Sequence, residues 1–197
     1  MRKIEKINLI TDLKSEAKNK KARICADRVL EILRTEQFKI AVLGMDRNIW
    51  LQGETGIFKN LSNDEIYELL MSGKEEWNLE ADYEIDIKMV GYWGKKLSRV
   101  IAYMNPGKPQ IYQNLRKFNG LSKKKLCGNM VHEWCHTLGG RHSGKYFRLS
   151  FEYYMNKVVE KIYQDLYPEE NSMVNFKKIC TRKWYRLFTK KCYLVRE

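Results

Sequence analysis

The sequence predicts an α+β fold, because strand-like patterns dominate the first half of the chain and helical patterns the second half. Apolar and charged residues alternate over residues 83–89, which is typical of a strand with one side facing solvent. Apolar residues recur at three- and four-residue spacing over residues 14–34 and 154–166, which is typical of amphipathic helices. The 197 residues are 44% hydrophobic, enough for one core. We therefore expect a single domain over residues 1–197.

Local signals predict two further elements in the first half of the chain. The short apolar run at residues 38–43 is closed by a glycine and predicts a buried strand. Ser62 is followed three positions later by Glu65, which is a capping-box pattern. This pattern predicts a helix that begins near Asn63 and ends near Gly73.

The second half of the chain contains both strand and helix signals. Residues 98–104 and 110–114 are predicted to be two strands, joined across a Pro-Gly turn. Ser122 is a suitable N-cap for a helix that runs to Leu138, where two glycines end it. The basic and aromatic residues 173–194 are interpreted as a further helix.

Composition indicates a protein of the cytoplasm. The chain has no run of 18 apolar residues, so no transmembrane helix is expected. Its basic start breaks into polar residues too soon for a secretory signal. Five cysteines without a C-x-x-C pair are expected to be free thiols in a reducing compartment.

Charge is distributed unevenly along this basic chain, whose net charge is +13. Residues 52–87 carry a net charge of −8, from ten acidic and two basic side chains, whereas residues 171–197 carry +7, from eight basic and one acidic. The basic segment at residues 171–197 also contains Trp184, Tyr185 and Phe188, and basic residues among aromatics are typical of nucleic-acid binding. The alternative is a helix that buries its aromatic residues and exposes a solvated basic side.

The three histidines of the chain lie within eleven residues, in the pattern His132-Glu133-x-x-His136-x-x-Gly139-x-x-His142. On a helix, residues four apart are about 40° from each other around the axis, so two such imidazoles can reach one ion. Glu133 lies about 100° further round, near a water molecule on that ion. Gly139 lets the chain leave the helix so that His142 returns as third ligand. Three protein ligands with an open fourth position are typical of catalytic zinc.

The other side of this predicted helix is apolar and should pack on the core. Its apolar residues are Cys127, Met130, Val131, Trp134 and Leu138. Gly128 lies on the imidazole side, one turn before His132, where a larger side chain is expected to crowd the metal.

The eleven-residue pattern resembles the signature of the metzincin clan of zinc peptidases, especially small intracellular or phage-type members. The resemblance implies a twisted mixed sheet over a zinc-binding helix, followed by C-terminal helices, with an antiparallel edge strand along the cleft. His132, His136 and His142 would bind one Zn²⁺ per chain, and Glu133 would be the general base. It also implies a methionine turn beneath the metal, for which Met155 is the candidate; an ordinary core methionine is the alternative.

A second resemblance concerns the residues after the second histidine. The motif His132-Glu133-x-x-His136 is followed by five intervening residues, then His142, and then the aromatic Tyr146 four positions later; this is similar to the pattern of WLM-domain proteases, which degrade proteins crosslinked to DNA. Those proteases usually carry phenylalanine at this aromatic position, where this chain has tyrosine. The basic charge is compatible with such a partner.

Taken together, these patterns predict a zinc-dependent metalloendopeptidase that hydrolyses protein or peptide substrates. Zinc lowers the pKa of its bound water to about 7, and Glu133 accepts the proton and passes it to the leaving amine. Tyr153 and Tyr154 are candidate donors to the oxyanion. The alternatives are a basic, nucleic-acid-associated zinc protein and a structural zinc protein, although structural sites normally have four protein ligands.

Overall fold

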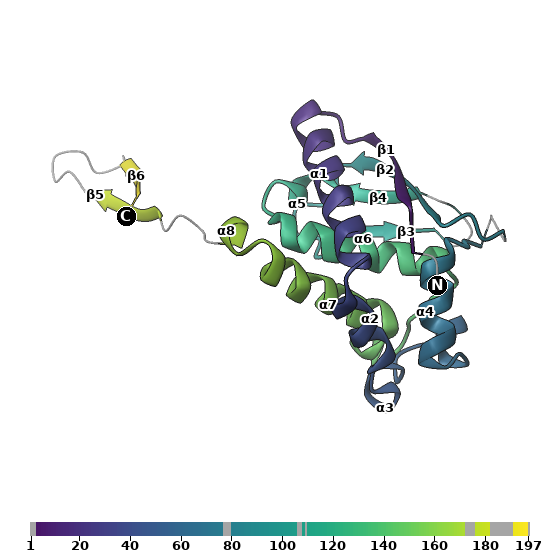
Figure 1. Cartoon of the computed structure of the whole chain (residues 1–197). Helices are drawn as coiled ribbons and strands as arrows, with labels where there is room; N and C mark the ends of the chain where they lie inside the picture. Colours follow the sequence, from purple (N-terminus) through teal and green to yellow (C-terminus); the bar gives the residue numbers. More distant parts are fainter. Residues whose placement is uncertain are drawn as a thin grey trace.

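The protein is described by a computed structural model over residues 3–76, 80–105, 108, 110–171, 176–181 and 191–196. Helices α1 (Glu16–Leu33) and α6 (Lys123–Thr137) lie against one face of a four-stranded sheet (Figure 1). Helix α7 (Phe151–Leu166) packs along α6, further from the sheet (Figure 1). The predicted α+β class is therefore confirmed, and α6 lies at the centre of the molecule.

The sheet is mixed and has the strand order β1-β2-β4-β3. Strands β1 (Lys6–Asp12), β2 (Glu84–Tyr92) and β4 (Gln110–Asn114) run parallel to one another. Strand β3 (Ala102–Met104) pairs antiparallel to β4 and forms one edge. Alternate residues of β2 are buried, as the alternating pattern predicts: Ile85, Ile87 and Met89.

Helix α4 (Asn63–Ser72) forms as its capping box predicts. The hydroxyl of Ser62 accepts a hydrogen bond from the backbone N–H of Glu65, and the carboxylate of Glu65 accepts one from the N–H of Ser62. Gly73 ends the helix at φ 71°, a left-handed conformation that favours glycine. The sequence signal is sufficient here because every contact that caps the helix is local.

The strand predicted at residues 38–43 is wrong, because this segment belongs to helix α2 (Glu36–Leu43). The hydroxyl of Thr35 caps the helix by accepting a hydrogen bond from the N–H of Phe38. Phe38 and Val42, four residues apart, are both buried, whereas Ile40 between them is 62% exposed. Only helical geometry puts residues 38 and 42 on the same side and residue 40 on another, and a short apolar run does not reveal that by itself.

Other boundaries differ from the prediction. Only Ala102–Met104 of the predicted strand 98–104 is a strand. The residues before it form a turn instead, because the N–H of Ser98 donates to the carbonyl oxygen of Lys95 and the N–H of Val100 donates to the hydroxyl of Ser98. Helix α7 begins three residues before residue 154, after the buried N-cap Ser150. The predicted Pro-Gly turn lies outside the described residues.

The helix predicted at residues 173–194 is also wrong within the part that the structure describes. Strands β5 (Phe176–Thr181) and β6 (Lys191–Arg196) pair antiparallel with each other. Both segments are rich in aromatic and β-branched residues, which favour strands. Residues 182–190, with Trp184, Tyr185 and Phe188, lie outside the described residues.

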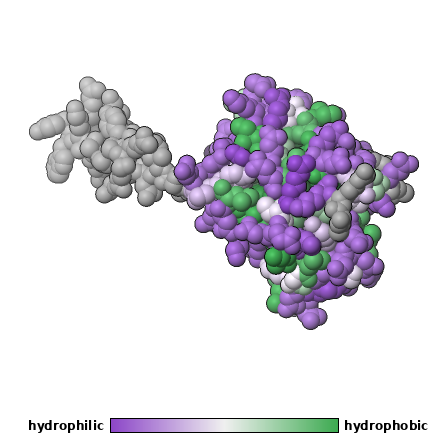
Figure 2. Space-filling model, in the orientation of Figure 1, coloured by the Kyte–Doolittle hydropathy of each residue, from purple (hydrophilic) through white to green (hydrophobic). Residues whose placement is uncertain are grey.

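The remaining elements are short and connect the longer ones. They are α3 (Arg47–Trp50), η1 (Ile57–Lys59), α5 (Leu115–Phe118), η2 (Phe147–Leu149) and α8 (Pro168–Asn171). Hydrophilic residues cover most of the face shown in Figure 2, with smaller hydrophobic areas between them. Among the described residues, no helix is both long and apolar enough to cross a bilayer. Cys25, Cys127 and Cys135 are buried free thiols, as predicted for these three.

Candidate metal centre

The three histidines converge on one point. His132 and His136 project from α6, and His142 lies on the turn that follows it. One ring nitrogen from each histidine lies within 4.8 Å of the other two. Two imidazoles four residues apart on a helix can share an ion, and the third arrives from outside the helix. The structure therefore brings together the ligand set that the sequence predicts.

Helix α6 directs these imidazoles away from the core. The hydroxyl of Ser122 accepts a hydrogen bond from the N–H of Lys125 and caps the helix at its predicted start. The predicted apolar side is buried: Cys127, Met130, Val131, Trp134 and Leu138. Burial of this side sets the rotation of the helix about its axis, so both imidazoles face the opposite side.

The two glycines that the sequence singled out have different roles. Gly139 adopts φ 93°, the left-handed conformation expected where the chain turns back toward the metal centre. Gly128 does not act as predicted. A Cβ atom there would lie 2.9 Å from the carbonyl oxygen of Asn156 and 2.9 Å from Cγ of Glu160. Gly128 therefore permits the close approach of α6 and α7 rather than leaving space for the metal.

The histidine ring nitrogens are arranged as a metal site requires. Nδ1 of His136 lies 3.0 Å from the carbonyl oxygen of Gly140, which orients the ring and leaves Nε2 available. Nδ1 of His132 and Nε2 of His142 are buried without a hydrogen-bond partner among the described residues. Buried polar atoms normally have a partner, and an ion would supply one. Three imidazoles are a donor set that suits zinc.

Burial also favours the protonation state that binds metals. It lowers the pKa of His132 to about 3 and lowers the pKa values of His136 and His142 below their ordinary value. All three rings are therefore neutral at pH 7, and neutral imidazole is the ligand form.

Glu133 is buried at the same centre. Burial, together with the nearby charge of Glu152, raises the pKa of its carboxyl to about 8. A cation at the histidines would act against this shift, because a nearby positive charge favours the carboxylate. Glu133 thus lies where it can accept and return a proton near neutral pH.

A cavity of about 680 Å³ opens onto these residues. The residues that line it include His132, Glu133 and His136, together with β3, residues 147 and 148, and the first half of α7. Of the two predicted strands at residues 98–104 and 110–114, only the first borders this cavity. The expected position of an edge strand beside the histidines is therefore observed.

Tyr153 and Tyr154 lie on different sides of α7, because consecutive helical residues point about 100° apart. The ring of Tyr153 lines the cavity, 4.6 Å between centroids from His132. Burial raises the pKa of its phenol, which therefore stays protonated and able to donate. The hydroxyl of Tyr154 instead donates to the carbonyl oxygen of Ala41 at 2.6 Å, so Tyr154 does not join the site.

Met155 is a buried residue inside helix α7. A residue in the interior of a regular helix cannot form a tight turn, so the methionine turn predicted at Met155 is wrong. The alternative interpretation of an ordinary core methionine is correct. Its side chain contributes to the packing of α7 against the core.

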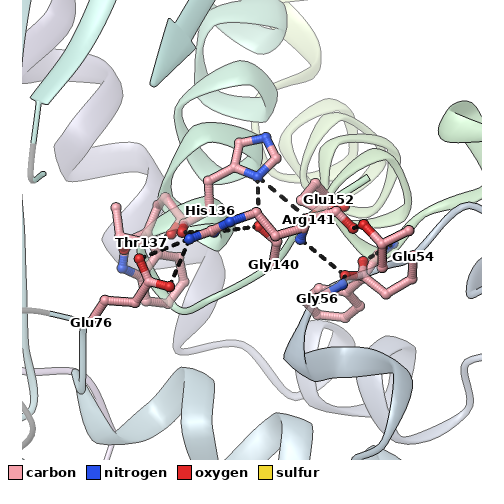
Figure 3. Close-up of polar contacts among 11 residues, drawn as sticks. Glu54, Gly56, Glu76, His136, Thr137, Gly140, Arg141 and Glu152 are labelled. Carbon is pink, nitrogen blue, oxygen red and sulfur yellow. Dashed lines mark hydrogen bonds and ion pairs between the residues drawn. The ribbon is translucent and has the colours of Figure 1, made fainter. Parts of the chain in front are cut away.

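Several acidic residues that no sequence pattern singles out surround the histidines. Nδ1 of His136 lies 3.5 Å from the carboxylate of Glu152, which is fully buried, and Glu54 is buried close to both (Figure 3). Burial, together with the charge of Glu152, raises the pKa of Glu54 to about 7. Glu76 pairs with the guanidinium of Arg141. Glu54 and Glu76 lie in a segment whose excess of acidic residues was visible, but nothing local indicates which of them reaches the histidines.

Comparisons with protein-family models, curated proteins and solved structures find no match for this chain. The resemblance to metzincins thus depends on the pattern from His132 to His142, and that to WLM-domain proteases on the same residues with Tyr146. The fold and site themselves define an α+β protein with a candidate three-histidine metal centre beside an acidic residue.

Proposed function

We propose that this chain is a zinc-dependent metallopeptidase with metzincin-like architecture. One observation carries the proposal: three neutral imidazoles and the carboxyl of Glu133 meet at a single cavity. A structural zinc site would normally have a fourth protein ligand and no open cavity beside it. In the described part of the chain, the group of metal-ligating side chains around these histidines contains only the three imidazoles.

The residues present would hold and use zinc in distinct ways. A zinc ion held by the three histidines would supply a Lewis acid that polarises a carbonyl and lowers the pKa of water to about 7. Glu133 accepts a proton from the attacking water and donates it to the leaving amine. The phenol of Tyr153 donates a hydrogen bond to the oxyanion that develops on the carbonyl. The acid–base work therefore falls to Glu133, and the neutral donor is Tyr153.

Strand β3 offers a binding surface for an extended peptide. Among the described residues it pairs on one side only, with β4, so its other edge is unpaired. Its three residues, Ala102, Tyr103 and Met104, line the cavity of the histidines. An extended substrate can add to such an edge through main-chain hydrogen bonds, which supports a peptide as the substrate.

Tyr153→Phe tests the proposed neutral donor. We expect kcat to fall about 10²-fold with unchanged zinc content, because the phenyl ring keeps the packing and removes only the hydroxyl. The matched control is Tyr154→Phe, which removes a hydroxyl bonded to Ala41. That change should leave kcat unchanged and cost about 1 kcal/mol of stability. Turnover of a quenched fluorogenic peptide measures kcat, and thermal unfolding measures the stability of each variant. Equal kcat for Tyr153→Phe and wild type removes Tyr153 from the mechanism.

Net charge supports a second candidate, a nucleic-acid-associated protease. The +7 charge of residues 171–197 would contact phosphates, and each contact releases counterions. For six contacts we expect duplex DNA affinity to fall at least about 10³-fold between roughly 50 and 200 mM salt. Deletion of residues 173–197 should abolish this binding. Fluorescence anisotropy with labelled DNA measures it, and absence of binding at about 50 mM salt rejects this candidate.

A further inference from the structure

The turn that carries His142 is held by a segment more than eighty residues earlier in the chain. Residues 53–57 run beside residues 139–143 and exchange backbone hydrogen bonds with them. The N–H groups of Thr55 and Ile57 donate to the carbonyl oxygens of Arg141 and Gly139 at 2.7 and 3.1 Å, and that of Ser143 donates to Gly53 at 3.3 Å. An isolated antiparallel bridge joins Glu54 to His142. The third histidine is thus fixed by long-range pairing.

The side chain of Glu54 completes this arrangement. Its Oε1 accepts hydrogen bonds from the N–H of Arg141 at 3.0 Å and from the N–H of Gly56 at 2.8 Å (Figure 3). The residue is only 1% exposed. One carboxylate oxygen of Glu54 therefore connects Arg141, the residue before His142, to the segment 53–57. Hydrogen bonds from backbone N–H groups to a buried carboxylate are among the stronger ones in proteins.

A second, more exposed contact holds the same turn from its other side. The guanidinium of Arg141 forms a two-pronged ion pair with Glu76, at 2.7 and 2.9 Å. It also donates to the carbonyl oxygens of His136 and Gly140, at the end of α6 (Figure 3). Arg141 therefore joins the helix end to the turn, while Glu54 holds the backbone of Arg141 itself.

We propose that Glu54 is a positioning residue for the metal centre, which sets where His142 lies relative to the two histidines on α6. This inference rests on the proposed zinc site but not on proteolysis. Partners that orient metal ligands typically change metal affinity about 10–100-fold when removed. Glu54 does not line the cavity, and its Oε1 accepts from backbone N–H groups, so its positioning effect passes through the backbone of residues 141 and 142.

The test measures metal binding in the full chain, with zinc and with cobalt as a spectroscopic substitute. Glu54→Ala removes the acceptor for both N–H groups, so the zinc Kd should rise about 10–100-fold. The visible absorption of the cobalt form should also change, because the third imidazole is displaced. Glu54→Gln keeps an acceptor oxygen at the same position, so it should restore the wild-type spectrum and a Kd within about threefold of wild type.

Glu75→Ala is the matched control for loss of a buried glutamate. Glu75 is also 1% exposed, but it accepts from the N–H of Asp86 in the sheet rather than from the turn. Glu75→Ala should lower the melting temperature of the metal-free and zinc forms equally. Glu54→Ala should instead reduce the rise in melting temperature that zinc produces, because zinc then binds more weakly.

The outcomes separate this inference from the proposed function. Wild-type protein that binds neither metal overturns both. A zinc Kd for Glu54→Ala within about threefold of wild type, or an equal loss in Glu75→Ala, overturns the positioning role alone. If Glu54→Ala does not fold, Glu54→Asp carries the test, because it keeps the charge but shortens the side chain by one methylene. Wild-type zinc affinity and cobalt absorption in Glu54→Asp would then reject the proposal.

Discussion

Replacing Glu133 with glutamine is expected to keep zinc bound while reducing peptide hydrolysis at least about a thousandfold. Glutamine has nearly the same shape as glutamate and still accepts a hydrogen bond, so α6 and the three imidazoles should be undisturbed. It cannot accept a proton, so the attacking water is not activated and the leaving amine is not protonated. Each transfer is typically worth about 10²–10⁴-fold, and Glu133 would serve both steps.

The measurement compares kcat/KM on fluorescein-labelled casein with zinc content from elemental analysis. Glu75→Gln is the control, because it makes the same change at another buried glutamate, one that does not line the cavity. It should retain wild-type activity. Mapping of new peptide N-termini in a lysate treated with wild type or Glu133→Gln would then identify substrates. Full zinc with near wild-type hydrolysis in Glu133→Gln would disprove the mechanism while leaving the metal site intact.

Replacing His142 with alanine is expected to remove zinc from the chain and abolish hydrolysis. Structural zinc sites with four ligands bind with about 10–16 kcal/mol, which is roughly 3 kcal/mol for each ligand. Loss of one of only three ligands should therefore weaken zinc binding at least about a hundredfold. Wild-type protein should contain one zinc per chain, and His142→Ala should lose it during dialysis against a mild chelator.

Ser143→Ala is the control for His142→Ala, because Ser143 is exposed and joins the turn through its backbone N–H, which alanine retains. It should keep one zinc per chain. Elemental analysis after dialysis measures both variants. Undiminished zinc in His142→Ala, or its absence from carefully purified wild-type protein, would contradict the assignment of the metal centre.

Local chemistry explains which elements the sequence predicts correctly. The capping box at Ser62 and the N-cap at Ser122 involve contacts within four residues, so each helix start is encoded where it occurs. The alternation in β2 reports directly which of its sides is buried. In contrast, β1 shows no clean alternation of buried and exposed residues, so its pattern predicts no strand. The apolar run in α2 was misassigned because short runs do not distinguish a buried strand from a buried helix.

The candidate site shows the same division between local and long-range information. The three histidines, Glu133 and the helix that presents two of the imidazoles follow from local spacing, because helical geometry converts that spacing into proximity. In contrast, Tyr153 rather than Tyr154 lines the cavity because the rotation of α7 depends on what the helix packs against. The contact of Glu54 with the turn of His142 is likewise visible only in the folded chain. That contact joins segments more than eighty residues apart, and no local spacing encodes a pairing that only the folded chain brings together.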